Sequence, residues 1–192
     1  DLFKLKVNGT QEEKWVLLIS INPGAPNGGS ATQYFVGDFD GKTFTTNQKE
    51  TKWVDNGTDN YAGVTYNDAP NGDRIFLGWM SNWNYARNTP TTNWRSAMTL
   101  PRTLSLSTIE GGYVLQSKPV AQFNQQLTTA FSKEKIKIKK GSEKTFDYPN
   151  LNQSQIQFKA ANKNLKLIFT NKVHDSLVLN YDAQKQQFSI DR

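Results

Sequence analysis

Apolar and polar residues alternate along most of this chain, in short runs that turn residues separate. Alternation with a period of two is typical of β-strands with one buried face. The dipeptides Asn8-Gly9, Asp40-Gly41 and Asn71-Gly72 favour tight hairpin turns between such runs. No stretch predicts a helix longer than a short turn within 120–127. The expected strands are 1–7, 14–21, 32–39, 42–46, 52–54, 61–66, 74–83, 94–106, 136–138, 155–159, 165–170, 177–181 and 188–190.

The run 74–83 is expected to form a β-hairpin with a strand that begins at Trp94. Trp79 and Trp83 share one face of the first strand, and Gly78 leaves room for another group to approach the backbone. Indole rings stack on the apolar faces of sugar rings, and their N–H can donate to a hydroxyl, so this pair suits a carbohydrate ligand. Filling a β core is the commoner use of such a pair, and both interpretations stay open.

The order of the strands predicts an all-β fold in two domains. Residues 1–46 and 52–106 form two successive four-stranded meanders, which favours propeller blades, with a β-sandwich as the alternative. Tryptophan disappears, and lysine and glutamine increase, beyond a junction near 118–120. We therefore expect residues 1–118 to supply the last blades of an incomplete β-propeller. Residues 119–192 are expected to form an incomplete β-sandwich.

Composition excludes several classes of chemistry. The chain has no cysteine, a single histidine (His174, expected at a surface turn), no Gly-x-Ser-x-Gly motif and no phosphate-binding glycine loop. Thiol catalysis, a multi-histidine metal site and nucleotide binding are therefore not predicted. No apolar run approaches the length of a membrane span. The formal charge is +6, and lysines within 133–144 alternate with Ile136 and Ile138, which predicts the solvated face of a strand rather than a nucleic-acid surface.

Carboxylates and aromatic side chains remain, and these are the groups that act on carbohydrates. Asp55 and Asp59 lie where the chain enters a strand, and Asn22 lies where the chain leaves one. Side chains at strand ends would line the central pocket of a propeller. Turn capping is the competing explanation for these polar residues. Arg95 either pairs with a carboxylate or lies on the surface.

Several segments, in this order along the chain, resemble glycoside hydrolase family 32, the family of invertases, levanases and inulinases. The resemblance is dense over residues 1–120 and weaker beyond them. The sequence from Gly78 to Trp83 is most similar to that of exo-acting levanases, inulinases and sucrases. The segments are Ile19-Ser-Ile-Asn-Pro-Gly-Ala-Pro-Asn-Gly-Gly-Ser30, Gln33-Tyr-Phe-Val-Gly37, Asp55-Asn-Gly-Thr-Asp-Asn-Tyr-Ala62, Gly78-Trp-Met-Ser-Asn-Trp83 and Trp94-Arg-Ser-Ala-Met-Thr-Leu-Pro-Arg102.

The resemblance implies a five-bladed β-propeller followed by a β-sandwich, and a retaining mechanism. In such enzymes an aspartate attacks the fructosyl anomeric carbon, a glutamate acts first as acid and then as base, and a second aspartate stabilises the transition state. The glutamate belongs to a Glu-Cys-Pro-Asp motif whose last residue matches Asp1. All three carboxylates are therefore expected upstream of Asp1, so that the chain holds no catalytic residue and, as a fragment of a longer β-fructosidase, is inactive alone.

The same resemblance assigns roles around the substrate. It implies that Asp55 contacts fructose hydroxyls, that Trp79 forms the aromatic wall of the pocket and that Asn22 reaches the adjoining sugar. Tyr61 is a further substrate-binding candidate, and Trp83 is expected in the core. The expected partner is sucrose or a fructan, with no cofactor, metal ion, nucleic acid or membrane, and the expected location is extracellular. Two alternatives remain, a non-catalytic glycan-binding protein and a fructosyltransferase on the same scaffold.

Overall fold

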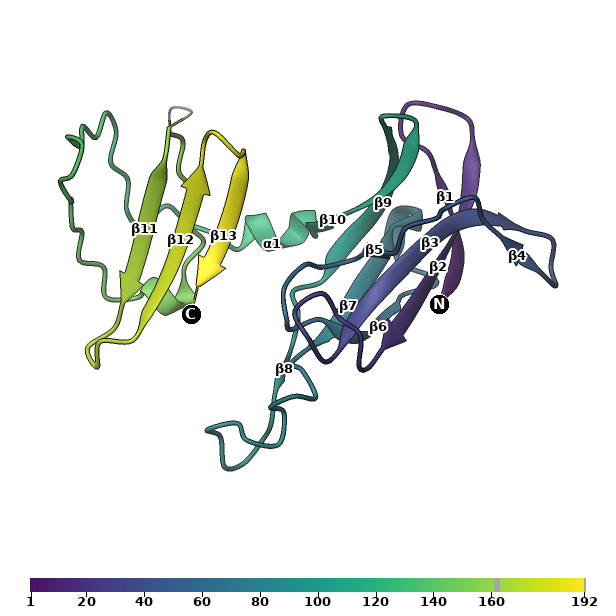
Figure 1. The fold of residues 1–192 in the computed structure, drawn as a ribbon, viewed down its shortest axis with the longest axis horizontal. Coiled ribbons are helices and arrows are strands. Elements are labelled where there is room, and N and C mark those ends of the chain that lie inside the picture. Colours follow the sequence, from purple (N-terminus) through teal and green to yellow (C-terminus); the bar gives the residue numbers. More distant parts are fainter. Residues whose placement is uncertain (161–162, 192) are drawn as a thin grey trace. The chain divides into compact units, whose positions relative to one another are not determined.

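The computed structural model describes residues 1–160 and 163–191, and it confirms an all-β architecture (Figure 1). The chain divides into unit 1, residues 1–128, and unit 2, residues 129–192. Within the described residues, no helix is long and apolar enough to cross a membrane. The short helical segments are η1 (Pro70–Gly72), α1 (Ala121–Gln125) and η2 (Leu151–Gln153).

The first sheet of unit 1 is an antiparallel meander in the order β1-β2-β3-β4, with β5 also paired to β3. Its strands are β1 (Leu2–Lys6), β2 (Glu13–Ile21), β3 (Ala31–Phe39), β4 (Phe44–Thr45) and β5 (Lys52–Trp53). The side chain of Gln48 bridges the gap between β4 and β5, because it donates to Tyr34 O at 2.9 Å and accepts from Val36 N–H at 3.3 Å. The expectation that 52–54 opens the second meander is therefore wrong, since β5 completes the edge of the first.

The second sheet is also antiparallel, in the order β10-β9-β7-β6, with β8 paired to β7. Its strands are β6 (Tyr61–Thr65), β7 (Arg74–Met80), β8 (Ala97–Met98), β9 (Arg102–Ile109) and β10 (Gly112–Pro119). The expected strand 94–106 is interrupted. Trp94 lies in a loop, Ser96 has a positive φ of 70° that no extended strand tolerates, and Pro101 has no N–H to give to a ladder. In place of the single expected strand, two separate strands, β8 and β9, pair with β7.

The two sheets of unit 1 share one hydrophobic core. The backbones also join directly, because Val7 bridges to Leu106 and the N–H of Asn8 donates to Leu106 O at 2.7 Å. Alternate residues of strands from both sheets point into this core, as the period of two requires. The buried members are Phe3, Val7, Val16, Leu18, Tyr34, Val36, Phe76, Leu104, Leu106 and Leu115.

Tyr34 is a polar member of that core. Its side chain comes from the first sheet, and its hydroxyl oxygen accepts the N–H of Leu115 in the second sheet at 3.2 Å. Burial raises the pKa of the Tyr34 hydroxyl, and the hydrogen bond from Leu115 offsets part of that rise. The folded state therefore keeps the proton to a higher pH than the unfolded chain does, and the free energy of unfolding falls as pH rises above about 10.

Tyr34→Phe is expected to lower the free energy of unfolding at pH 7 by about 1–2 kcal/mol, because the buried N–H of Leu115 loses its acceptor. The difference from the native chain should shrink above about pH 10, since only the native chain has a Tyr34 proton to lose on unfolding. Urea unfolding of both chains at pH 7 and at alkaline pH measures this. A difference that stays constant over that range would contradict the linkage to Tyr34.

Unit 2 contains a three-stranded antiparallel sheet in the order β11-β12-β13. Its strands, β11 (Leu165–Thr170), β12 (Ser176–Asp182) and β13 (Gln187–Asp191), confirm three of the expected strands. His174 is exposed at the turn between β11 and β12, as expected. The expected strands at 136–138 and 155–159 are wrong, because both stretches are irregular and their apolar residues are exposed. Alternation alone does not make a strand where no neighbouring strand supplies the ladder.

Candidate functional site

An aromatic row runs from β6 across β7 into the loop that follows. Tyr61 and Trp79 are partners in the register of the two strands, with ring centroids 6.2 Å apart. Trp79 and Trp83 follow at 5.2 Å. Since β7 ends at Met80, Trp83 lies in the loop, where it is 49% exposed. The expectation that Trp83 fills the core is therefore wrong, and the row ends in solvent.

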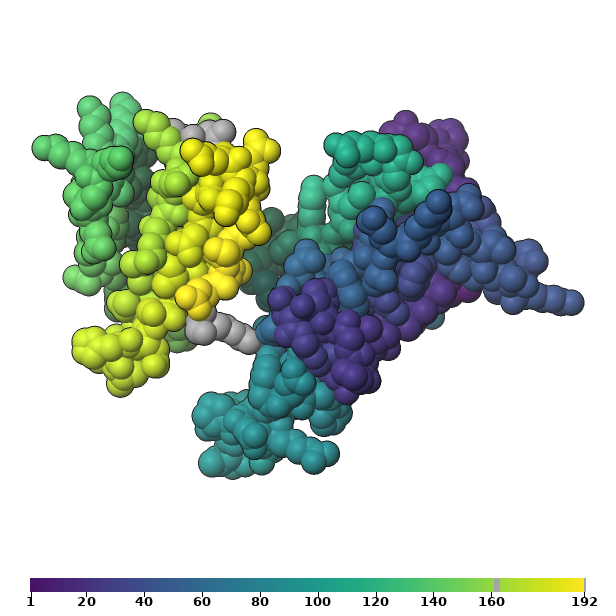
Figure 2. All heavy atoms as spheres, in the orientation of Figure 1, coloured from purple at the N-terminus to yellow at the C-terminus, as the bar shows by residue number. Residues whose placement is uncertain are grey.

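The exposed end of this aromatic row lines an open hollow of about 430 Å³, which Trp83 shares with Asn22 and Arg87. Asn22 follows the last residue of β2, and its Oδ1 accepts a hydrogen bond from the Ser30 hydroxyl at 3.0 Å. Arg87 belongs to the loop between β7 and β8, part of which projects beyond the two sheets of unit 1 (Figure 2). An indole, a carboxamide and a guanidinium around one hollow offer a stacking face and several hydrogen-bond groups for hydroxyls.

Asp55 is partly buried, and both of its oxygens have partners within the chain. Oδ1 accepts the N–H of Gly57 at 2.7 Å, which is an Asx turn. Oδ2 accepts from an Arg102 guanidinium nitrogen at 3.1 Å and from Asn60 Nδ2 at 3.3 Å. Turn capping is therefore one role of Asp55. An ionised carboxylate offers about four lone-pair sites, so Asp55 keeps acceptor capacity for a ligand hydroxyl, and this contact stays a prediction.

Gly78 makes room for a side chain of the chain itself. A Cβ placed on Gly78 would lie 2.1 Å from Oδ1 of Asn60, so no larger residue fits without a shift. Asn60 is buried, and its Nδ2 bonds to Asp55. The predicted close approach to the backbone of Gly78 is confirmed. Its consequence is that Asn60 links the middle of the second sheet to the carboxylate of Asp55.

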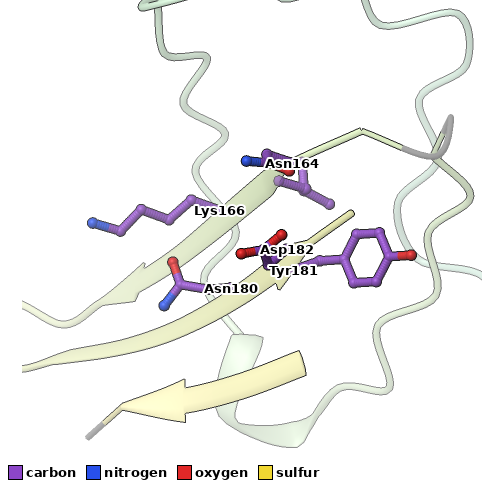
Figure 3. A pocket seen from close by; sticks show the side chains of 6 residues that line it. Asn164, Lys166, Asn180, Tyr181 and Asp182 are labelled. Carbon is purple, nitrogen blue, oxygen red and sulfur yellow. The ribbon is translucent and has the colours of Figure 1, made fainter. Parts of the chain in front are cut away.

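Unit 2 has a separate hollow of about 320 Å³ at one end of the β11–β12 hairpin (Figure 3). Lys166 and Asn180 pair across the two strands, and Tyr181 points away from them. Oxygens of Asp182 and Asn164 accept backbone N–H groups of residues 183–185, so these two side chains already serve the turn between β12 and β13. Among the residues that the structure describes, no three His, Cys, Asp or Glu side chains are grouped as a metal site.

Comparison with known families and relatives decides the family. Residues 1–119 match the model of the glycosyl hydrolases family 32 N-terminal domain. The chain belongs to glycoside hydrolase family 32. The levanase of Bacillus subtilis (strain 168) is 46% identical over 127 residues, which are 64% of this chain and 19% of the levanase. The extracellular exo-inulinase inuE of Aspergillus niger is 35% identical over 206 aligned residues, which cover 100% of this chain and 38% of that protein.

Solved structures place the same fold in family 32. The crystal structure of the exo-inulinase from Aspergillus awamori matches with a TM-score of 0.77 and 28% identity, over 100% of this chain and 40% of that one. The fructofuranosidase from Schwanniomyces occidentalis complexed with fructose matches with a TM-score of 0.76 and 28% identity, over 100% and 41% of the two chains. The resemblance inferred from the sequence is thus confirmed. The chain spans about two fifths of the length of these structures.

Four substrate-binding candidates can now be placed in this family 32 chain. Tyr61 and Trp79 lie side by side in the aromatic row, and Trp83 follows Trp79 in that row. Asn22 lines the hollow that Trp83 also lines. Asp55 lies in the loop before β6. Asp59, a weaker candidate, lies in that same loop and is partly buried.

Sequence reasoning missed the residues that hold these candidates in place. Arg95 is exposed and donates to Arg87 O at 2.6 Å, and the guanidinium that pairs with Asp55 belongs to Arg102. Arg102 is 47 residues from Asp55, so no local spacing reveals the pair. The residues missed are Ser30, Asn60, Asn82, Arg87 and Arg102.

Proposed function

We propose that the protein to which this chain belongs is a retaining β-fructosidase that releases fructose from sucrose or fructans, and that this chain supplies one wall and the mouth of its fructose site. The observation that carries the proposal is the aromatic row of Tyr61, Trp79 and Trp83, which ends at a hollow shared with the carboxamide of Asn22. Sugars are bound by stacked rings with a few directed polar groups beside them. The named relatives in family 32 are a levanase and an exo-inulinase.

Each candidate has a distinct role in this proposal. Trp79 and Tyr61 face the fructosyl ring, the Asp55 carboxylate accepts hydrogen bonds from its hydroxyls, and Asn22 contacts the adjoining sugar. In a retaining reaction a carboxylate attacks the anomeric carbon while an acid protonates the leaving oxygen, and water then releases the fructosyl group. No residue of this chain is given either of those two roles. The chain's own groups bind and orient the sugar, and the isolated chain is expected not to hydrolyse it.

The proposal extends to architecture and location. Residues 1–118 would supply the last two blades of a five-bladed β-propeller, and residues 119–192 part of a β-sandwich. Two antiparallel sheets that share one core support the first assignment, since neighbouring blades pack face to face. The three-stranded sheet of unit 2, with its alternating apolar positions, supports the second. Secretion is proposed because the exo-inulinase relatives are named extracellular.

A chimera tests the proposal. Residues 1–119 of this chain, the range matched by the family model, replace the corresponding segment of the Bacillus subtilis levanase. The chimera is expected to release fructose from levan with retention at the anomeric carbon, followed by NMR, while the isolated 192-residue chain gives no more fructose than a blank. A folded chimera that binds levan without cleaving it would favour a glycan-binding protein. Longer oligosaccharides as the main products would favour a fructosyltransferase.

A further inference from the structure

Asn82 is a buried carboxamide between Ser81 and Trp83, with only 1% of its surface exposed. Its Nδ2 donates to the carbonyl oxygens of Thr58 at 2.9 Å, Gly28 at 3.1 Å and Ser30 at 3.4 Å. Its Oδ1 accepts the N–H groups of Asn84 at 3.0 Å and Ser30 at 3.3 Å. Both ends of one side chain are thus occupied by backbone groups from three separate segments.

Those three segments carry the candidate site. Gly28 and Ser30 belong to the loop between β2 and β3, which begins with Asn22. Thr58 belongs to the loop between β5 and β6, which contains Asp55. Asn84 belongs to the loop between β7 and β8, which contains Trp83. Loop residues lie outside the hydrogen-bond ladders of the sheets, so their buried N–H and C=O groups need side chains as hydrogen-bond partners. Asn82 does so for all three segments at once.

Ser30 connects Asn82 to two residues of the hollow. Ser30 is fully buried, and its hydroxyl donates to Oδ1 of Asn22 at 3.0 Å. The hydroxyl oxygen of Ser30 also accepts the N–H of Trp83 at 3.2 Å. The orientation of the Asn22 carboxamide and the backbone position of Trp83 therefore depend on Ser30. The backbone of Ser30 is in turn bonded to Asn82 on both its N–H and its carbonyl side.

Gly29 shows how closely this arrangement is fitted. A Cβ on Gly29 would lie 2.0 Å from Oδ1 of Asn82, and the φ of Gly29 is +68°, where other residues are strained. Only glycine lets the loop backbone approach the carboxamide this closely. The loop and Asn82 are therefore shaped to each other.

We propose that Asn82 is a positioning residue that sets the mouth of the sugar site, acting through Ser30 on Asn22 and Trp83. This role rests on the proposed function as far as its effect on substrate is concerned. Asn82 is buried, and both ends of its side chain are bonded to backbone groups of the chain itself. It fixes the spacing between the end of the aromatic row and the Asn22 carboxamide, and that spacing determines how well a sugar beyond the fructosyl ring fits the hollow.

Asn82→Asp tests the proposal with a nearly isosteric change. It replaces the donating Nδ2 by an oxygen that faces three carbonyl oxygens. Gln48→Glu is the matched control, because it makes the same chemical change in a carboxamide that bridges Tyr34, Val36 and Glu50 and has no bond to the hollow. Ser30→Ala is the second variant, since it removes the hydroxyl link without adding charge.

Two measurements separate this inference from the proposed function. In the 192-residue chain, hydrogen exchange at the Trp83 and Ser30 amides, relative to the Val16 amide in the core, is expected to accelerate at least about tenfold in Asn82→Asp and not in Gln48→Glu. In the levanase chimera, KM for levan is expected to rise about fivefold in Asn82→Asp and in Ser30→Ala, with kcat changed less than about twofold.

The outcomes decide between roles. An inactive parent chimera would count against the proposed function, while the exchange measurement would still decide on Asn82. Unchanged exchange at Trp83 in both Asn82→Asp and Ser30→Ala would overturn the positioning role. Equal changes of KM in Asn82→Asp and Gln48→Glu would overturn it as well, because they would reflect general loss of structure. If Asn82→Asp does not fold, Ser30→Ala carries both measurements.

Discussion

Phe76→Ala is expected to lower the free energy of unfolding of unit 1 by about 3–5 kcal/mol. Phe76 lies in the middle of β7 with 0% of its surface exposed, in the core that the two sheets share. A Cβ on Gly63 would lie 2.1 Å from Cζ of Phe76, so β6 omits a side chain to admit the ring. Alanine leaves this space empty, because two hydrogen-bonded sheets cannot close around it.

Tryptophan fluorescence measures this effect without interference from unit 2. All five tryptophans precede residue 95, so urea unfolding followed by their emission reports on unit 1 alone. Trp94→Ala is the control, since Trp94 is a large aromatic residue that is 64% exposed, and its loss should change stability by no more than about 0.5 kcal/mol. Equal shifts of the urea midpoint in the two variants would contradict a close-packed core around Phe76.

The position of Phe76 in that core also shows how far the sequence predicted the fold. Alternation placed strands at 74–83 and 61–66, and the structure has β7 and β6 there. The irregularity between Tyr61 and Val64, where Gly63 makes way for Phe76, was not predicted. It depends on the size of a residue in the neighbouring strand, and the sequence of β6 alone does not contain that information.

The errors in the fold share one cause. The stretch 136–138 alternates as well as many real strands do, and it is irregular. Lys52 and Trp53 were assigned to the following meander, and they pair with β3. In each case periodicity described which face a residue would present, while the existence and the pairing of a strand depend on which backbone lies beside it.

The residues of the candidate site also fall into two groups, those that the sequence predicted and those that it did not. Trp79 was predicted from the alternation of its strand and Tyr61 from the family resemblance. Both lie in strands, and the register of those strands places the two residues opposite each other. Asn82, Ser30 and Arg102 were missed because they act through loop contacts that span dozens of residues. A buried carboxamide between Ser81 and Trp83 reads as part of an alternating strand, and its function is visible only once three loops meet around it.

Asp55→Ala, introduced into the levanase chimera, is expected to lower kcat/KM for levan at least about tenfold, which corresponds to about 1.4 kcal/mol of lost transition-state stabilisation. Two effects contribute. The fructosyl hydroxyls lose their proposed acceptor, and the partly buried guanidinium of Arg102 loses its carboxylate. The second effect is structural, since an uncompensated charge and an unmade Asx turn at Gly57 loosen the loop before β6.

Arg102→Ala separates these two effects, because it breaks the same ion pair and leaves the Asp55 carboxylate in place. If Asp55 binds substrate, Asp55→Ala loses several times more activity than Arg102→Ala at a temperature where both chimeras are fully folded. If Asp55 serves only the turn and the ion pair, the two losses are similar and follow the measured stability. A loss below about twofold in Asp55→Ala would leave turn capping as its whole role. The oxygens of Asp55 already have three partners from within the chain, so this comparison tests whether the remaining lone-pair capacity is used by a sugar.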